Sequence, residues 1–143
     1  MYKKIIFCTD GSLNSACAQR EAIKMAKECS AELVAVCVVD ITDEFEAIAP
    51  GTTEKLEKHA REIAEGVAAA ATAEGLKASA VVREGDPGQK ILEVARETGA
   101  DAIVLGTHGR RGFMSSVMGS VANRVISEAF VPVVIIHSKF CKI

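Results

Sequence analysis

The sequence predicts an α/β domain in which a doubly wound, Rossmann-like sheet of five parallel strands carries helices on both faces. Five short apolar runs alternate along the chain with four segments of helical period. The runs are rich in Val and Ile, and several are continuous, which is typical of strands buried on both faces. At 143 residues the chain has the length of one such domain, and we expect residues 1–143 to form it without a repeat or a second domain.

Each apolar run predicts one strand. The predicted strands cover residues 3–8, 32–39, 77–82, 102–105 and 133–136. The segments between them place most apolar residues three, four or seven positions apart, which predicts one buried face on each helix. These stripes are Leu13, Ala16, Ile23 and Ala26; Leu56, Ala60, Ile63, Val67 and Ala70; Ile91, Val94 and Ala95; and Val121, Val125 and Ile126. Because strands and helices alternate, the strands are expected to run parallel, joined by helical crossovers.

Turn and cap residues mark the expected boundaries of the helices. Ser12 is expected to cap the first helix, and Asp86 followed by Pro87 is typical of a helix start. Pro132 is expected to stop the fourth helix and to open the last strand. The second and third helices are expected to end at Gly75 and Gly99.

The composition excludes several classes of function. The net charge of −2 argues against non-specific binding of nucleic acids, which requires a basic surface. No apolar run approaches about 18 residues, so we expect no membrane span. The first apolar run is interpreted as a strand and not as a signal peptide. The five cysteines are odd in number and contain no C-x-x-C, which favours free thiols and a cytoplasmic location over a disulfide framework.

The segment from Gly106 to Ser120 carries the clearest functional signal. It follows an apolar run, leads into a helical segment and has the pattern G-x2-G-x9-G-[S/T]. A glycine-rich loop between a strand and a helix is where a parallel sheet binds anions. Gly106 and Gly109 let the backbone approach a phosphate closely, whereas Gly119 and Ser120 stand at a helix N-terminus, where free N–H groups favour an anion. The segment therefore predicts a phosphate-binding loop.

Two further segments are expected at the same edge of the sheet. Residues 9–11 follow the first predicted strand, and residues 38–40 end the second. Ligands of doubly wound sheets bind beyond the carboxyl ends of the strands, so both segments are expected to converge on the glycine loop.

Several individual roles stay open on the sequence alone. Asp10 either binds a ribose or a metal, or only forms an Asp-Gly turn. His108 contributes its backbone or a catalytic imidazole, and Ser120 is a ligand or only a helix cap. Arg110 and Arg111 either add charge to the site or are solvated loop residues.

Other nucleotide and catalytic motifs are absent from the sequence. It contains no G-x-x-x-x-G-K-[S/T], no G-x-G-x-x-G after the first strand, no G-x-S-x-G and no H-E-x-x-H. Without a phosphate-clamping lysine, the glycine loop does not predict the chemistry of a P-loop hydrolase.

These segments match the pattern of a known family over essentially the whole chain. The matching segments are residues 5–12 (IIFCTDGS), 38–40 (VVD), 85–87 (GDP), 101–109 (DAIVLGTHG), 119–122 (GSVA) and 131–134 (VPVV). In this combination the chain resembles the universal stress protein family. The resemblance implies a sheet order of 3-2-1-4-5 and membership of the ATP-binding branch, which carries the G-x2-G-x9-G-[S/T] loop.

The resemblance also implies a set of nucleotide-binding residues. Asp10 would bind the ribose with Thr9 beside it, and Val38 would contact adenine through its backbone. The full set is Thr9, Asp10, Val38, Leu105, Gly106, His108, Gly109, Gly119, Ser120 and Val121. Mg²⁺ or Mn²⁺ would bridge the phosphates, and no catalytic residue is implied. Cys8 and Ala122 depart from the pattern. Relatives often carry proline or another small residue at position 8, and some ATP-binding relatives carry a hydroxyl residue at position 122.

The family usually forms homodimers, often through the last strand, here Val133–Ile136. An apolar strand at an open sheet edge supports such pairing on physical grounds.

The expected function is that of an ATP-binding regulatory protein of the stress response, acting as a nucleotide-dependent switch. The loop is complete, and no general base stands beside it in the sequence. One alternative is a slow ATP hydrolase in which Asp10 or His108 orients water or metal. Another is a dimeric interaction module with an incidental nucleotide, whose partner surface includes Phe45 and Ile48.

Overall fold

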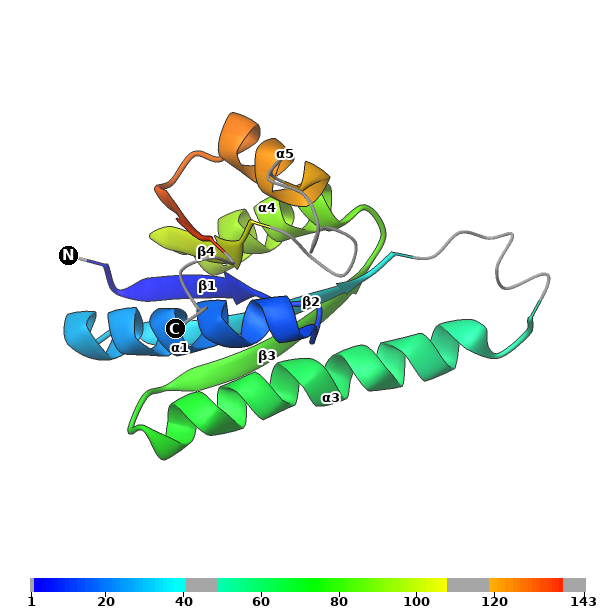
Figure 1. The fold of residues 1–143 in the computed structure, drawn as a ribbon, viewed down its shortest axis with the longest axis horizontal. Helices are drawn as coiled ribbons and strands as arrows, with labels where there is room; N and C mark the ends of the chain where they lie inside the picture. The colour runs from blue at the N-terminus through cyan, green and yellow to red at the C-terminus, as the bar shows by residue number, and fades with distance from the viewer. Residues whose placement is uncertain (1, 41–48, 108–118, 138–143) are drawn as a thin grey trace.

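The architecture of the chain comes from a computed structural model, which describes residues 2–40, 49–107 and 119–137. The elements are β1 (Lys4–Cys8), α1 (Leu13–Cys29), β2 (Glu32–Val39), α3 (Thr52–Ala73), β3 (Ala78–Glu84), α4 (Pro87–Thr98), β4 (Ala102–Gly106), α5 (Ser120–Glu128) and β5 (Val133–Ile136). The strands form one sheet in the order β3-β2-β1-β4-β5, and all neighbouring pairs are parallel (Figure 1). The predicted fold class and strand order are confirmed.

The sheet is buried on both faces. Ile5 and Phe7 of β1 pack toward α1 and α3, whereas Ile6 between them packs toward α4 and α5. All three side chains are fully buried. Successive side chains of a strand point to opposite faces, so a strand covered on both faces requires a continuous apolar run. Figure 1 shows α1 and α3 on one side of the sheet and α4 and α5 on the other.

Helix ends follow the predicted caps at most positions. Asp86 caps α4 by accepting a hydrogen bond from the backbone N of Gln89 at 2.9 Å, and Pro87 occupies the first turn. Gly99 ends α4 in the left-handed conformation, with φ 70°. The end of α1 was not predicted, because its C-cap, Ser30, adopts φ 55° and a serine gives no sequence signal for that conformation.

Several predicted boundaries differ from the structure: β1 and β3 begin one residue later than predicted, and α3 ends at Ala73, before Gly75. α5 ends at Glu128, so Pro132 opens β5 but does not stop the helix. Gly106 is the last residue of β4 and not the first residue of the loop. β3 extends to Glu84, beyond its apolar run, because a strand at the edge of a sheet tolerates exposed charged side chains.

The cysteines differ from the expectation in one case. Cys8, Cys29 and Cys37 are free, whereas Cys17 is disulfide-bonded. The expectation of free thiols is therefore wrong for Cys17. An odd number of cysteines excludes a framework in which every cysteine is paired, but it leaves room for a single bond.

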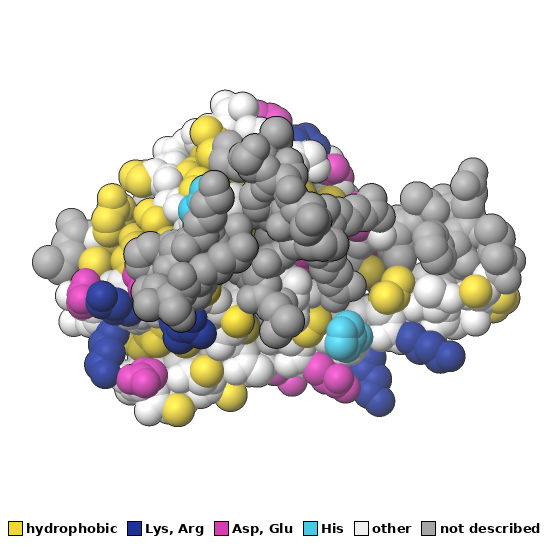
Figure 2. Space-filling model, viewed as in Figure 1, with side chains coloured by type: hydrophobic (Ala, Val, Ile, Leu, Met, Phe, Trp, Pro, Cys, Tyr) yellow, Lys and Arg dark blue, Asp and Glu magenta, His cyan; other side chains and the backbone are white. Residues whose placement is uncertain are grey.

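β5 forms an apolar edge of the sheet. Among the described strands it pairs only with β4, and its four Val and Ile residues are all only partly buried. Ile126 and Phe130, which precede it, are 44% and 50% exposed. Figure 2 shows hydrophobic side chains gathered where α5 ends and β5 begins. None of the helices in the described ranges is long and apolar enough to cross a membrane.

Asp101 joins the amino ends of β1 and β4. Its Oδ2 accepts hydrogen bonds from the backbone N of Lys3 at 2.8 Å and of Lys4 at 2.9 Å. These two hydrogen bonds are the main reason why the pKa of the Asp101 carboxyl lies below its ordinary value.

Asp101→Asn is expected to lower the melting temperature at pH 7. A carboxyl whose pKa is lower in the folded than in the unfolded chain stabilises the fold above the unfolded pKa of about 3.9. That contribution is lost as the pH falls through the folded pKa, so the difference in melting temperature should shrink in acid. Thermal melts at pH 7 and at about pH 3 measure it. Glu57→Gln on the exposed side of α3 is the control, and a difference that persists unchanged in acid contradicts the prediction.

Candidate functional site

The carboxyl ends of β1, β2 and β4 bring the predicted site segments to one edge of the sheet. β1 lies between β2 and β4 and is parallel to both. Extending the two registers by two residues beyond the last paired positions places Asp10 level with Val38 and Thr9 level with Gly106. Residues far apart in the sequence therefore meet at this edge.

The two ends of the glycine loop also meet there. The backbone N of Gly119 donates a hydrogen bond to the carbonyl O of Thr107 at 2.7 Å. Thr107 in turn donates its N–H to the carbonyl of Ile136 at 3.2 Å, which ties the base of the loop to the end of β5. The start of α5 consequently lies beside the end of β4.

Within the described residues, no side chain caps the N-terminus of α5. Gly119 is its N-cap, with φ −64° and ψ 158°, and has no side chain that could accept from the first-turn N–H groups. Ser120 occupies the first helical position and is exposed, so Gly119 and not Ser120 is the N-cap residue. Unfilled first-turn donors and the positive end of the helix dipole favour an anion at this point.

The turn after β1 is held by its own side chains. Asp10 Oδ1 accepts a hydrogen bond from the backbone N of Ser12 at 2.9 Å, and Gly11 adopts φ 78°. The hydroxyl of Thr9 donates to Ser15 Oγ at 3.0 Å and accepts from the N–H of Gly11 at 3.0 Å. Asp10 therefore has the predicted turn-forming role, and the Thr9 hydroxyl is engaged at the start of α1.

Ser12 has a feature that the sequence did not predict. It is the N-cap of α1, as expected, but its side chain makes no capping hydrogen bond. Its Oγ is shielded from solvent and has no hydrogen-bond partner within the described part of the chain. Buried hydroxyls almost always have a partner, so this oxygen is a candidate ligand atom next to Asp10. The D-G-S sequence indicated a turn and a cap but gave no sign of an unpaired hydroxyl.

One apolar wall adjoins the edge. Val38, Leu105 and Val121 belong to the hydrophobic cluster between the sheet and α4 and α5. Leu105 is buried, whereas Val38 and Val121 are partly exposed. An apolar wall beside uncapped N–H groups suits a ligand with a flat apolar part and an anionic part.

The structure thus places eight of the ten predicted site residues at or near one edge. They are Thr9, Asp10, Val38, Leu105, Gly106, Gly119, Ser120 and Val121. His108 and Gly109 lie outside the described residues, as do Arg110, Arg111, Phe45 and Ile48. Within the described ranges, no group of three or more His, Cys, Asp or Glu residues is arranged to hold a metal ion.

Comparison with known proteins places this fold and edge in a family. The profile of the universal stress protein family matches residues 1–137. The chain belongs to this family. Universal stress protein MJ0531 of Methanocaldococcus jannaschii is 39% identical over 140 residues, which cover 95% of this chain and 82% of the relative.

Solved structures show the same universal stress protein fold. The structure of hypothetical protein MJ0577 superposes with a TM-score of 0.85 and 26% identity, covering 96% of each chain. A universal stress protein in complex with cAMP gives a TM-score of 0.73 at 24% identity, covering 96% of this chain and 98% of that one. The Archaeoglobus fulgidus universal stress protein in complex with dAMP gives 0.62 at 24% identity, covering 94% and 97%.

Two residues by which this chain departs from the universal stress protein pattern are accommodated in the fold. Burial, and secondarily the neighbouring Cys37, raises the pKa of the Cys8 thiol, so the thiol stays protonated at neutral pH and is a poor nucleophile. Cys8 therefore packs as a small apolar side chain. Ala122 is 2% exposed and lies in the same cluster, where a methyl group needs no hydrogen-bond partner.

Proposed function

We propose that this universal stress protein binds ATP or a related adenine nucleotide at the carboxyl edge of its sheet and acts as a nucleotide-dependent switch in a stress response. The observation that carries the proposal is the hydrogen bond from Gly119 N to Thr107 O. It closes the glycine loop at its base, so the uncapped N-terminus of α5 faces the edge formed by β1 and β4. Two structural neighbours hold cAMP and dAMP, which are adenine nucleotides.

The residues at the edge suit the parts of such a nucleotide. Asp10 offers a carboxylate to the ribose, and Val38 and Leu105 offer apolar surface and backbone to the base. The phosphates would meet the backbone N–H groups and the hydroxyl at the start of α5. The proposed set is Thr9, Asp10, Val38, Leu105, Gly106, His108, Gly109, Gly119, Ser120 and Val121.

Two polar groups that have no partner among the described residues support the fit. The Ser12 hydroxyl is buried and unpaired in the described part of the chain, and α5 has no side-chain cap. A buried hydroxyl left without a partner costs about 1–3 kcal/mol, which a polar ligand group at this position would recover. Ser12 lies two residues after Asp10, and α5 begins at Ser120, so each group adjoins a residue of the proposed site.

A Mg²⁺ or Mn²⁺ ion would enter with the phosphates and neutralise part of their charge. Its ligands would be mainly phosphate oxygens and water, because Mg²⁺ is commonly held by few protein carboxylates. Asp10 is the carboxylate of the proposed site, and it already accepts a hydrogen bond in the turn after β1.

Calorimetry with Mg-ATP tests the proposal. Titration of the wild-type protein at millimolar nucleotide is expected to give a saturable binding signal, and the absence of any signal with ATP, ADP, AMP or cAMP overturns the proposal. Native mass spectrometry of freshly purified protein adds an independent reading, because a retained nucleotide shows as a mass increment.

A turnover assay separates the switch from the alternative of a slow hydrolase. Under the switch hypothesis, ATP bound to the protein is recovered intact after long incubation. Steady release of ADP in proportion to protein concentration favours the hydrolase.

We also propose that a second copy of the chain pairs with β5. The edge strand Val133–Ile136 is apolar and only partly buried, and the exposed Ile126 and Phe130 extend the apolar surface beside it. Light scattering is expected to give twice the chain mass of 15.1 kDa. A monomer at all concentrations contradicts the pairing. The cytoplasmic location stays a prediction, because Cys8, Cys29 and Cys37 are free among the described residues whereas the disulfide of Cys17 is typical of an oxidising compartment.

A further inference from the structure

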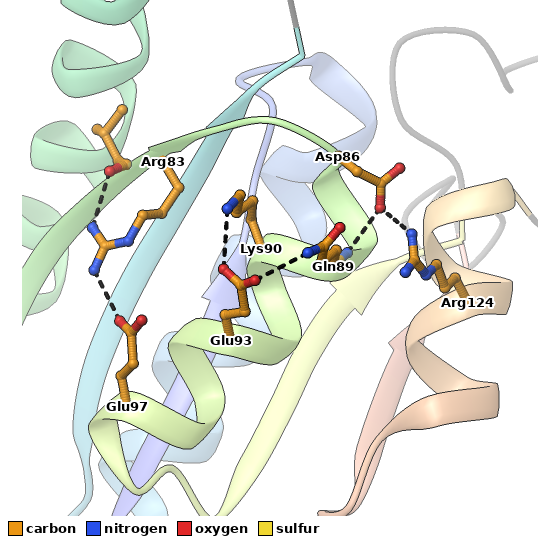
Figure 3. Close-up of polar contacts among 8 residues, drawn as sticks. Arg83, Asp86, Gln89, Lys90, Glu93, Glu97 and Arg124 are labelled. Atoms are coloured by element: carbon orange, nitrogen blue, oxygen red, sulfur yellow. Dashed lines mark hydrogen bonds and ion pairs between the residues drawn. The ribbon is translucent and has the colours of Figure 1, made fainter.

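Asp86 and Arg124 connect the first turn of α4 to α5. Asp86 Oδ2 accepts from the backbone N of Gln89 at 2.9 Å and also binds Nη1 of Arg124 in a close ion pair (Figure 3). Arg124 Nε donates to Glu128 Oε2 at 2.9 Å, one turn further along α5. One carboxylate therefore caps α4 and holds α5 at the same time.

The side chain of Arg124 also lies against the backbone of α4. A Cβ built on Gly88 would stand 2.9 Å from Arg124 Cδ and 3.2 Å from Cγ. Gly88 is buried, so the missing side chain at this position is what lets the Arg124 stem lie so close. The contact between the helices thus combines an ion pair with close packing.

This contact matters because α5 is short and, among the described residues, has few other polar contacts to the neighbouring elements. The helix has nine residues, and only Ala122 and Val125 are buried. Val125 is fully buried and Val121 packs partly buried against the same cluster, so the apolar contact of the helix is short and centred on Val125. Arg124 is four residues after Ser120, which places the two on the same side of the helix, one turn apart. The Asp86 contact therefore acts one turn from the N-terminus of α5.

We propose that Arg124 is a positioning residue for the phosphates: paired with Asp86, it holds the N-terminus of α5 in the orientation that receives them. This inference rests on the proposed nucleotide binding. In this arrangement Arg124 is occupied by two carboxylates and contributes through helix orientation, not by contact with the ligand.

Two substitutions test the inference by calorimetry with ATP and with adenosine. Asp86→Asn retains an oxygen that can cap α4 but loses the charge, and Arg124→Met retains an unbranched apolar stem but loses the cation. Each is expected to weaken ATP binding about two- to fivefold, which lies within the range of an exposed ion pair. Adenosine lacks phosphates, so its affinity for both variants is expected to equal its affinity for the wild-type protein. Arg124→Lys retains a cation and is expected to bind ATP more tightly than Arg124→Met.

Arg83→Met is the matched control. Arg83 pairs with Glu97 at 3.1 Å, beside but separate from the Asp86–Arg124 contacts (Figure 3). The affinity of the Arg83→Met variant for ATP is expected to equal that of the wild-type protein.

The outcomes are distinct. If Arg124 instead contacted the phosphates, Asp86→Asn would free it and tighten ATP binding, which overturns the positioning role. Unchanged ATP affinity in both variants, or an equal loss of ATP and adenosine binding, also overturns it. If the wild-type protein binds neither ligand, the proposed function itself fails. Circular dichroism of each variant verifies that it is folded.

Discussion

Gly109→Val is expected to abolish binding of adenine nucleotides while leaving the protein folded. Gly109 is the second glycine of the G-x2-G-x9-G-[S/T] pattern and lies outside the described residues, so the expectation rests on the pattern. A phosphate cradled by backbone N–H groups must approach the main chain closely, and a branched side chain at a cradle position blocks that approach. Affinity for ATP should fall at least about tenfold, or about 1.4 kcal/mol, by calorimetry.

Gly66→Val is the matched control for this substitution. Gly66 is an exposed residue within α3, and a Cβ built there meets no atom within 4 Å. Valine is a somewhat better helix former than glycine, so stability should not fall. ATP affinity equal to that of the wild type is expected for Gly66→Val. Wild-type affinity in Gly109→Val would contradict the role of the glycine loop.

Phe7→Ala is expected to produce the largest loss of stability. Phe7 is the largest of the fully buried side chains and lies on β1, the central strand of the sheet. Truncating a buried phenylalanine costs about 3–5 kcal/mol, because the transfer free energy of the ring is lost and a cavity remains. That is a large part of the roughly 5–15 kcal/mol that stabilises a domain. Urea unfolding followed by circular dichroism measures the change.

Phe130→Ala makes the same substitution at an exposed position. The ring of Phe130 is 50% exposed and stands 5.0 Å from Arg96 Cζ, a cation–π contact. Exposed contacts of this kind contribute about 0.5–1 kcal/mol, so the loss should stay near that range when unfolding is measured at concentrations at which the chain is monomeric. Equal losses in the two variants would show that burial of Phe7 is not what stabilises the central strand.

Most elements could be predicted because their signals are local. The strands β2 and β5 have the bounds that their apolar runs predicted, and Asp86 caps α4 as its place before Pro87 indicated. The differences arise where packing overrides a local signal. β3 continues through two charged residues because it is an edge strand, and α1 ends at a serine in a left-handed conformation.

The sequence predicted most residues of the candidate site. The glycine loop and Asp10 carry recognisable patterns, and eight of the ten predicted residues lie in the described part of the chain. The unpaired Ser12 hydroxyl and the Asp86–Arg124 contact were not predicted. Asp86 and Arg124 are separated by 38 positions, and no periodicity links a helix cap to a residue on another helix. The nucleotide assignment itself came from the family resemblance.

The sequence by itself determined the alternation of strands and helices, the parallel sheet and the glycine loop between β4 and α5. These follow from burial on both faces and from turn residues, which act over a few neighbouring positions. Only the tertiary structure decided how α5 is held, through the bond from Gly119 N to Thr107 O at its start and the ion pair of Arg124 with Asp86 one turn later. Both contacts depend on the relative placement of whole elements, which side-chain packing in the assembled sheet determines.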